Sequence, residues 1–347
     1  MTKRAVLIGC NYPGTKAKLN GCINDVRRMH RCLLDRYGFP AEHIVVLIDT
    51  EGSANAQPTG KNIRAALSNM VASAKAGDIL FVHYSGHGVR LPADDDDTGY
   101  DECIVPTDMN LITDDDFREL VNKVAKGCRI TIVSDSCHSG GLIDKAKEQI
   151  GESTRPNWKA QVTNVEKPPP GSLKNLLDAA APKVKKLMKK VKRKFLGQEV
   201  EHLVTPKSLP LSTLIEILKQ KTGKLNIGVG ELRPTLFAMF RDDSTPKVKK
   251  IMTAVMWKFL GRGTDGGILI SGSQSGEEAA EVTPDGDGSR AYGALSNAIQ
   301  EIIAEMGGEM SNRELVVRAR ELLMRQGFTQ HPGLYCTDLH LHDRFIC

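Results

Sequence analysis

Residues 129–141 read RITIVSDSCHSGG, in which a mostly apolar run passes directly into a polar, glycine-rich segment. A run without polar–apolar alternation is typical of a strand that is buried on both faces of a parallel sheet. Similar runs occur at residues 5–10, 44–49, 78–84 and 267–271. The sequence therefore predicts a central sheet that contains these five strands.

Helical patterns separate the first four runs. Asn24 or Asp25 can cap one helix, Thr59 can cap a second, and residues 114–124 form a third. Later regular spacing predicts two more helices and a last strand, at 291–305, 313–323 and 332–336. Strands that alternate with helices predict an α/β fold, with a mostly parallel central sheet and helices on both faces. Functional residues are then expected on loops at the carboxyl ends of the strands.

The composition excludes several classes of protein. The chain has 347 residues, of which 40% are hydrophobic, so wholesale disorder is excluded. No apolar run approaches the roughly 18 residues of a membrane span, and the N-terminal residues do not form a signal peptide. Eight cysteines without a CxxC pair disfavour a zinc site and predict reduced thiols. We therefore expect a cytoplasmic protein, with the nucleus as an alternative.

The net charge of +5 is unevenly distributed. Charged side chains sum to −2 over residues 1–150, to +14 over 151–262 and to −7 over 263–347. The strand–helix rhythm also breaks after residue 150, with PPPG and a lysine-dense run. These patterns predict a large unit at 1–150, a basic, proline-containing linker at 151–207 and a small unit at 208–347.

An internal duplication lies in the basic region. Residues 182–198 read PKVKKLMKKVKRKFLGQ, and residues 246–262 read PKVKKIMTAVMWKFLGR. In the first copy the apolar residues fall on one face of a predicted helix. Three interpretations stay open: an ordinary surface helix, a contact with calmodulin or an anionic membrane, and non-specific contact with nucleic acid. A specific nucleic-acid partner is not expected.

Cys137 follows a predicted strand in a polar, glycine-rich setting, so its thiol is displayed rather than packed. A thiol needs a neighbouring base to become a nucleophile. His87 lies between two glycines after another predicted strand, whereas His83 is inside that strand and His138 faces away from the thiol. The sequence therefore predicts a Cys137–His87 dyad, with backbone amides around residues 140–141 as candidate oxyanion donors.

Two acids accompany the dyad. Asp135 lies two residues before Cys137, and Asp25 follows the turn after the first predicted strand. Two carboxylates that converge on one pocket would bind a guanidinium or ammonium group, which predicts cleavage after Arg or Lys. The alternative for Asp25 is a simple helix cap. A legumain-like, Asn-specific peptidase would share the fold and the dyad, but the paired acids weigh against it.

Acidic runs offer oxygen ligands for a cation. Residues 94–102 read DDDDTGYDE, and further acids stand at 114–116 and at Asp144. The first run is by itself typical of a solvated loop, and it is not an EF-hand, because the twelfth position from Asp94 is Val105 instead of Glu. The HExxH, GxSxG and P-loop motifs of other enzyme classes are absent.

The motifs YSGHG and DSCHSG place the dyad residues 50 apart, the separation found in caspases. They occur together with CNYPGT, NGCINDVRRM, DECIVP, AYGALSNAIQ and GFTQHPGLYC. These phrases cover nearly the whole chain outside the predicted linker, and the sequence resembles the metacaspases, in particular the plant-type class II branch. The resemblance implies a caspase-like fold, in which a larger N-terminal and a smaller C-terminal unit share one sheet.

The resemblance also implies a calcium-activated cysteine endopeptidase that cleaves proteins after Arg or Lys and processes itself in its linker. A monomer is implied as well, in contrast to caspase dimers. By motif, the family's pocket for a basic residue falls on Asp25, Ser85 and Asp135, and its calcium site on Asp101, Asp114, Asp115 and Asp144. A catalytically silent interaction module is the alternative, but such relatives usually lose a dyad residue, and both are present here.

Two positions depart from the family pattern, since Ser273 and Glu281 stand where members often have Cys and Asp. A basic linker also replaces the acidic one of relatives. We therefore hypothesise that the linker plugs the cleft as an inhibitor and is cut as a substrate once calcium binds. Residues 183–194 offer many cleavage points, and the alternatives, which the sequence does not rank, are Lys159, Lys167 and Lys207.

Overall fold

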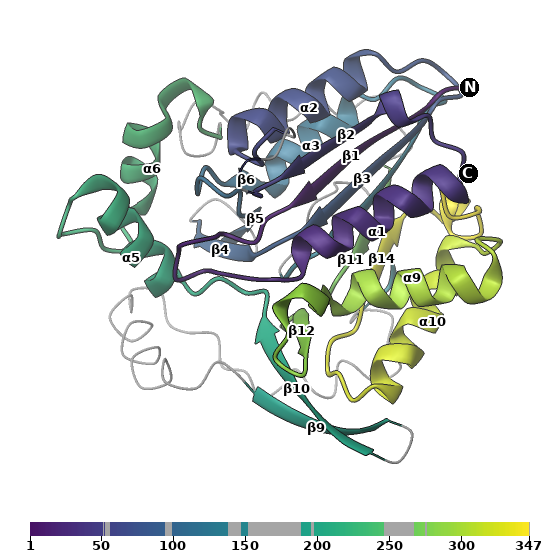
Figure 1. Ribbon diagram of the computed structural model, residues 1–347. Coiled ribbons are helices and arrows are strands. Elements are labelled where there is room, and N and C mark those ends of the chain that lie inside the picture. The colour runs from purple at the N-terminus through teal and green to yellow at the C-terminus, as the bar shows by residue number, and fades with distance from the viewer. Residues whose placement is uncertain are drawn as a thin grey trace.

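The computed structural model describes residues 1–50, 52, 56–93, 99–137, 147–151, 189–195, 198–245, 267–274 and 276–346. A seven-stranded sheet runs through its centre in the order β2-β1-β3-β7-β11-β14-β8 (Figure 1). The strands from β2 to β11 are parallel, and β14 and β8 are antiparallel to their neighbours. The bounds are β1 Lys3–Gly9, β2 Ile44–Ile48, β3 Ile79–Ser85, β7 Arg129–Asp135, β8 Lys147–Ile150, β11 Ile268–Ser271 and β14 Gly333–Cys336. The predicted α/β class and mostly parallel sheet are confirmed.

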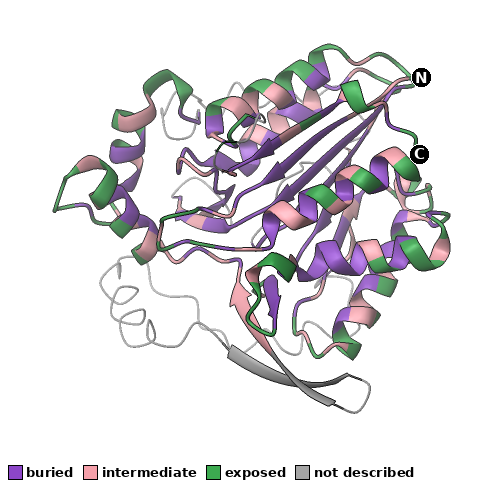
Figure 2. Ribbon diagram, viewed as in Figure 1, coloured by how far each residue is buried: buried purple, intermediate pink, exposed green. Residues whose placement is uncertain are grey.

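Helices cover both faces of the sheet, whose strands are largely buried (Figure 2). Successive strand residues point to opposite faces. Val6 and Ile8 accordingly pack with apolar residues of α2, α3, α5 and α6, whereas Ala5 and Leu7 pack with those of α1, α9 and α10. The helices are α1 Cys22–Asp35, α2 Gly60–Ala72, α3 Asp114–Asn122, α5 Leu211–Thr222, α6 Leu232–Phe240, α9 Ala294–Met306 and α10 Asn312–Arg325.

The first two helices begin differently from each other. Thr59 caps α2 as predicted, because its side chain accepts a hydrogen bond from the backbone N–H of Asn62. The residue before α1 is Gly21, and no side chain caps that helix, so the predicted cap by Asn24 or Asp25 is wrong. Asp25 lies in the first turn of α1 and is 1% exposed. Its carboxylate is thereby available for another contact.

Two smaller sheets flank the central one. The first consists of β4 Gly88–Pro92, β5 Tyr100–Ile104 and β6 Ile112–Thr113. The second consists of β9 Lys189–Phe195, β10 Gln198–Pro206, β12 Ala280–Pro284 and β13 Tyr292–Gly293. Short 3₁₀ helices lie at Ala41–His43, Arg241–Asp243, Gly288–Arg290 and Asp338–His340.

The strand β9 corrects the interpretation of the duplicated segment. Residues 189–195 form a strand, so the helix predicted at 182–198 is wrong for these residues. The strand pairs with β10, which pairs in turn with β12, and such tertiary pairing overrides local helical spacing. The end of the predicted linker is therefore part of a sheet. Residues 182–188 and 246–262 lie outside the described residues.

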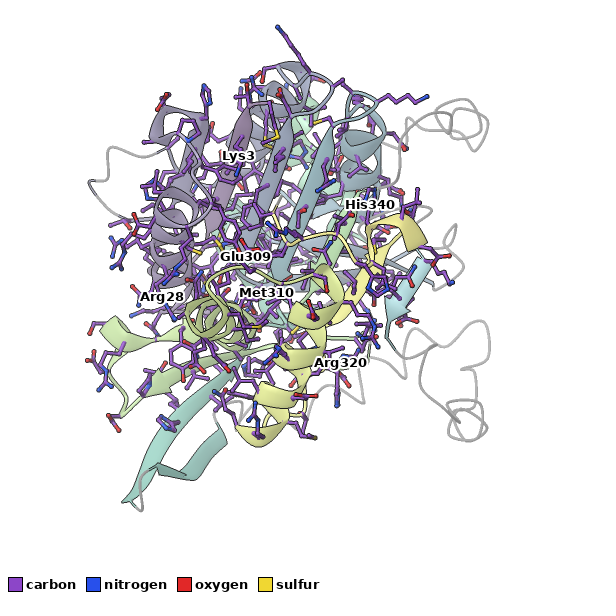
Figure 3. The ribbon with its side chains drawn as sticks, turned by 90° about the vertical axis from the view of Figure 1, so that its right-hand side faces the viewer. Lys3, Arg28, Glu309, Met310, Arg320 and His340 are labelled. Atoms are coloured by element: carbon purple, nitrogen blue, oxygen red, sulfur yellow. The ribbon has the colours of Figure 1, made fainter. Side chains whose placement is uncertain are left out.

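Polar contacts tie the helical layer together. Arg28 on α1 donates to the Asn297 side chain on α9 at 2.7 Å, and Arg320 on α10 donates to the Pro332 carbonyl, just before β14, at 2.6 Å. Figure 3 labels both arginines. Among the helices of the described residues, none has the length and hydropathy needed to cross a membrane.

Candidate active site

Two neighbouring strands bring the predicted dyad residues to one place. β3 and β7 run parallel, and their last residues, Ser85 and Asp135, are paired. His87 and Cys137 each follow two residues later. A Cβ atom on Gly88 would lie 1.8 Å from the carbonyl oxygen of Cys137, so the loop after β3 touches Cys137. The carboxyl edge of the sheet therefore collects both side chains, as expected for parallel strands.

The thiol of Cys137 is enclosed, so the expectation that it is displayed rather than packed is wrong. The residue is fully buried, and its Sγ accepts a hydrogen bond from the backbone N–H of Ala279 at 2.9 Å. Burial raises the pKa of the Cys137 thiol to about 12, although the Ala279 N–H acts in the opposite direction. In this arrangement the thiol is protonated at neutral pH, so it needs a base before it can act as a nucleophile.

His87 is a neutral base with a fixed orientation. Its Nε2 lies 2.8 Å from the carbonyl oxygen of Ala17. A carbonyl can only accept, so Nε2 carries the proton and Nδ1 is left to accept one. Burial lowers the pKa of His87 to about 4, against the effect of the Ala17 and Lys207 carbonyls. His83, in contrast, is buried inside β3 and contacts the Ser296 hydroxyl at 3.1 Å.

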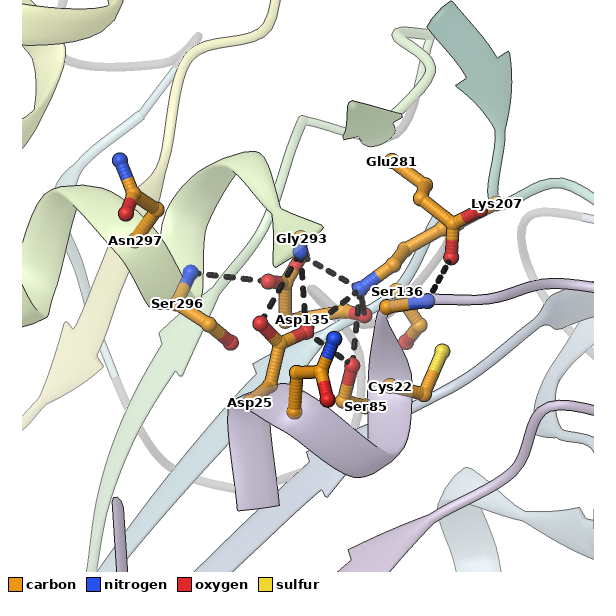
Figure 4. A network of polar contacts seen from close by, with 12 residues as sticks. Cys22, Asp25, Ser85, Asp135, Ser136, Lys207, Glu281, Gly293, Ser296 and Asn297 are labelled. Carbon is orange, nitrogen blue, oxygen red and sulfur yellow. Dashed lines mark hydrogen bonds and ion pairs between the residues drawn. The ribbon is translucent and has the colours of Figure 1, made fainter. Parts of the chain in front are cut away.

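A lysine of the chain itself, Lys207, fills the space between the two predicted acids (Figure 4). Its Nζ lies 3.3 Å from Asp135 Oδ1 and 3.6 Å from Asp25 Oδ2. The ammonium group also donates to the Ser85 hydroxyl at 2.9 Å and to the Asp135 carbonyl at 3.0 Å. All four residues are buried. The three predicted pocket residues therefore surround one basic side chain.

Backbone amides hold the two carboxylates in place. Asp25 accepts from the Gly293 N–H at 3.0 Å and from the Ser85 hydroxyl at 2.7 Å. Asp135 accepts from the Ser296 N–H, in the first turn of α9, at 2.8 Å. A Cβ atom on Gly293 would lie 2.2 Å from Asp135 Oδ2, so only glycine fits between the acids. The pocket is therefore built on fixed donors.

The charge of the pocket depends on its lysine. Burial raises the pKa of Asp25 to about 7, an effect that Lys207 opposes and Asp135 strengthens. Burial lowers the pKa of Lys207, but the surrounding negative charges, Asp135 first among them, outweigh burial and shift this pKa upward. Lys207 is therefore charged. Two buried carboxylates need such a cation, because an uncompensated buried charge costs several kcal/mol.

The two positions that depart from the family pattern are both buried. Glu281 on β12 accepts from the N–H groups of Gly21, at 2.7 Å, and Asn20, at 2.9 Å. These bonds fix the loop that leads into α1, the helix that carries Asp25. Ser273 donates its hydroxyl hydrogen to a carbonyl of its own loop at 3.3 Å. The Glu281 side chain thus stabilises the loop before α1 and does not itself bond to Lys207 in the hydrogen bonds of the described residues.

The backbone around Lys207 is held like an added strand. Residues 202–206 pair antiparallel with β12, and the Lys207 N–H donates to the Ala279 carbonyl at 2.9 Å. The Lys207 carbonyl accepts from the Gly88 N–H at 2.9 Å, and Leu209 donates to the Gly88 carbonyl at 2.8 Å. The segment therefore lies between Ala279, whose N–H bonds to the Cys137 thiol, and Gly88, which lies against the Cys137 backbone. Main-chain pairing of this kind is how many proteins bind extended peptides.

Gly88 is the residue that sequence reasoning missed. Its N–H donates to the Lys207 carbonyl and its backbone lies against that of Cys137, which makes this N–H a candidate oxyanion donor. The amides predicted from sequence, around residues 140–141, lie outside the described residues, and so does His138. The available signal was a glycine directly after His87, since the lack of a side chain lets this backbone approach the nucleophile.

Three of the four predicted calcium ligands lie together. Asp101 on β5 and the first two residues of α3, Asp114 and Asp115, each place an oxygen within 4.8 Å of the others. Asp144 lies outside the described residues. Burial raises the pKa of Asp114 to about 7, and Oδ1 of Asp114 has no hydrogen-bond partner among the described residues. A buried set of carboxylate oxygens with an unused acceptor fits a hard cation such as calcium.

Two arginines balance this acidic cluster. Arg118 on α3 pairs with Asp114 at 2.8 Å and with Asp115 at 2.6 Å. Arg233 on α6 pairs with Asp101.

Comparisons with known proteins agree with this geometry. Residues 3–146 match the family model of the metacaspase, peptidase C14 domain. The chain is 48% identical to metacaspase-4 of Arabidopsis thaliana over the whole of both chains, and 42% identical to metacaspase-9 of that plant over 99% of this chain and 96% of the relative. Among solved structures, protein GSU0716 of Geobacter sulfurreducens covers 99% of this chain with a TM-score of 0.58 at 19% identity, a likeness of fold alone.

A caspase-like α/β fold with a cysteine and a histidine at neighbouring strand ends defines a cysteine peptidase. The chain belongs to the metacaspase family, and to its plant type in particular.

Proposed function

We propose that the chain cleaves proteins after Lys or Arg, with Cys137 as nucleophile and His87 as base. The observation that carries this proposal is Lys207, a basic residue that the chain has placed between its own two acids, with its backbone N–H bonded to Ala279, the residue whose N–H bonds to the Cys137 thiol. A substrate that took the same path would present the bond after its basic residue to Cys137.

In the proposed reaction, Nδ1 of His87 takes the proton of the Cys137 thiol. The thiolate attacks the carbonyl carbon of the basic residue, and the Gly88 N–H binds the oxygen as it becomes negative. The imidazolium returns the proton to the leaving amine, which leaves a thioester on Cys137. Water then attacks the thioester, with His87 as base, and releases the carboxylic acid and the thiol.

The pocket gives the selectivity a physical basis. Arginine can bind two carboxylates with several N–H groups, and lysine does so as a point charge. An Asp or Asn side chain would leave Asp25 and Asp135 without a cation in a buried site. The two buried carboxylates therefore disfavour the Asn-specific alternative.

The position of Lys207 supports self-processing at one particular bond. After calcium is added, mass spectrometry should find a new C-terminus at Lys207 and a new N-terminus at Ser208. Lys207→Gln should remove this pair of termini, because glutamine brings no cation to the pocket. Lys224→Gln, an exposed residue of the same region, is the matched control and should process normally. Cuts elsewhere with an intact Lys207–Ser208 bond would contradict the assignment.

We further propose that calcium activates the chain through Asp101, Asp114, Asp115 and Asp144. When bound, the ion would neutralise these carboxylates and tie β5 to the start of α3. β5 pairs with β4, and Asp101 of β5 lies opposite Leu91 of β4. Because β4 begins at Gly88, this pairing supports a connection between the acidic cluster and the backbone that pairs with the Lys207 segment.

Calcium must then compete with the arginines. Arg233→Gln should lower the calcium concentration for half-maximal self-cleavage by about three- to tenfold, since a charge-assisted contact contributes roughly 1 kcal/mol or more. Calorimetry of calcium binding to the same variant in a Cys137→Ala background should show the same shift. Arg241→Gln, an exposed change on the adjoining turn, is the control. An unchanged calcium affinity in Arg233→Gln would contradict the competition.

We also propose that the chain is a monomer in a reducing cytoplasm, with the nucleus as an alternative. The strand β8 covers the edge of β14, and a short, charged edge strand resists further pairing. The seven cysteines of the described residues are free thiols. A calmodulin or membrane contact through 182–198 would need a helix, whereas residues 189–195 form a strand.

A further inference from the structure

We propose that Tyr12 is a positioning residue for the general base, which it holds through the backbone of His87; this inference rests on the proposed Cys137–His87 dyad. The Tyr12 hydroxyl accepts a hydrogen bond from the His87 backbone N–H at 2.8 Å and donates to the Val105 carbonyl at 2.6 Å. The Tyr12 ring lies against the imidazole, with 5.0 Å between centroids and 33° between planes. Tyr12 is fully buried.

The loop that carries Tyr12 is itself fixed in an uncommon conformation. Tyr12 has a φ of +50°, a left-handed value that few residues other than glycine adopt. The Asp49 carboxylate accepts from the N–H groups of both Asn11 and Tyr12, each at 2.8 Å. A conformation of this kind persists where surrounding contacts determine it.

The same loop holds His87 at a second point. The Tyr12 carbonyl accepts from the Thr15 hydroxyl at 2.9 Å in the turn that leads to Ala17. The Ala17 carbonyl is the acceptor for Nε2 of His87. One segment therefore fixes the backbone of the base through Tyr12 and the imidazole through Ala17. A shift of Tyr12 would move both contacts.

Tyr84 provides a contrast within the same cluster. Its hydroxyl donates to the His87 carbonyl at 2.7 Å and lies 3.2 Å from the Tyr12 hydroxyl. The His87 carbonyl also accepts from the Val105 N–H at 3.0 Å, so it keeps a donor when the Tyr84 hydroxyl is removed. The His87 N–H has no such second partner among the hydrogen bonds of the described residues. The two hydroxyls are therefore equivalent in burial but not in their effect on the base.

The test compares Tyr12→Phe with Tyr84→Phe in the calcium-treated enzyme. Tyr12→Phe should lower kcat about 10- to 100-fold with little change in KM, because a small displacement of a reacting group has an effect of this size. Alkylation of Cys137 by iodoacetamide should slow as well. Its rate should depend on pH as that of a thiol without a neighbouring base does, because His87 would no longer be held in position. Tyr84→Phe should change both readouts less than about threefold, although each variant lowers the melting temperature.

Equal kcat values and equal alkylation profiles for both variants would overturn the proposal and leave Tyr12 as a packing residue. If Tyr12→Phe does not fold, Asp49→Asn loosens the same loop without touching the ring, and an unchanged alkylation profile there would also overturn it. A wild-type chain that hydrolyses no peptide would instead contradict the proposed function. The alkylation profiles would still compare the two tyrosines in that case.

Discussion

Cys137→Ala should remove peptide hydrolysis and self-cleavage together, with kcat/KM reduced by roughly 10⁴-fold or more, as for other enzymes that lose their nucleophile. The reason is that the proposed reaction forms a thioester on Cys137 Sγ, and alanine has no nucleophilic atom in its place. The measurement is hydrolysis of a fluorogenic Val-Thr-Pro-Lys peptide, which copies residues 204–207, in the presence of calcium.

Two observations separate loss of chemistry from loss of fold. Cys137→Ala should keep the circular dichroism spectrum of the wild type, because the change removes one sulfur atom from a site where it accepts one backbone hydrogen bond. Cys128→Ala, at the partly exposed thiol before β7, should keep full activity as the matched control. Activity that survived in Cys137→Ala would move the nucleophile to another residue.

Asp135→Asn should have the second largest effect. The substitution keeps an oxygen for the Ser296 N–H but removes the charge nearest to the ammonium group, 3.3 Å away. Removing one partner of a buried charge pair costs about 2–5 kcal/mol, so kcat/KM for peptides ending in Lys or Arg should fall roughly 30- to 5,000-fold.

The matched variant is Asp25→Asn. This carboxylate lies farther from Nζ, at 3.6 Å, and burial already raises its pKa to about 7, so its removal should cost less than that of Asp135. Both variants are assayed on peptides of the form Val-Thr-Pro-X, where X is Lys, Arg, Gln or Asp. An Asp135→Asn enzyme with unchanged preference for Lys and Arg would show that the pocket does not select the basic residue.

The fold and the placement of His87 and Cys137 after neighbouring strand ends could be predicted because both depend on strong local patterns. Continuous apolar runs identify buried parallel strands, and the ends of β3 and β7 then bring His87 and Cys137 together. The predicted cap of α1 was wrong, but the prediction that Asp25 contacts a basic side chain agrees with the structure. Asp25 is in the first turn and contacts Lys207, so the simple helix cap is wrong for this residue.

Features that depend on pairing between distant segments could not be predicted. The chain has many lysines near its linker, and only the register of β10 on β12 selects Lys207 for the pocket. The same pairing makes residues 189–195 a strand despite their helical spacing. The glycine after His87 indicates a close approach of the backbone, but the sequence does not show that the Gly88 N–H contacts the Lys207 carbonyl.

We propose that this chain recognises the basic residue of a substrate through Asp25 and Asp135. The most direct measurement is the rate at which the wild-type chain, in calcium, hydrolyses the four Val-Thr-Pro-X peptides. Lys and Arg peptides should be cleaved at least about 100-fold faster than the Gln peptide. The reason is that leaving the two buried carboxylates without a cation from the substrate costs about 3 kcal/mol. Equal rates for all four peptides, or fastest cleavage after Asp, would contradict this proposal.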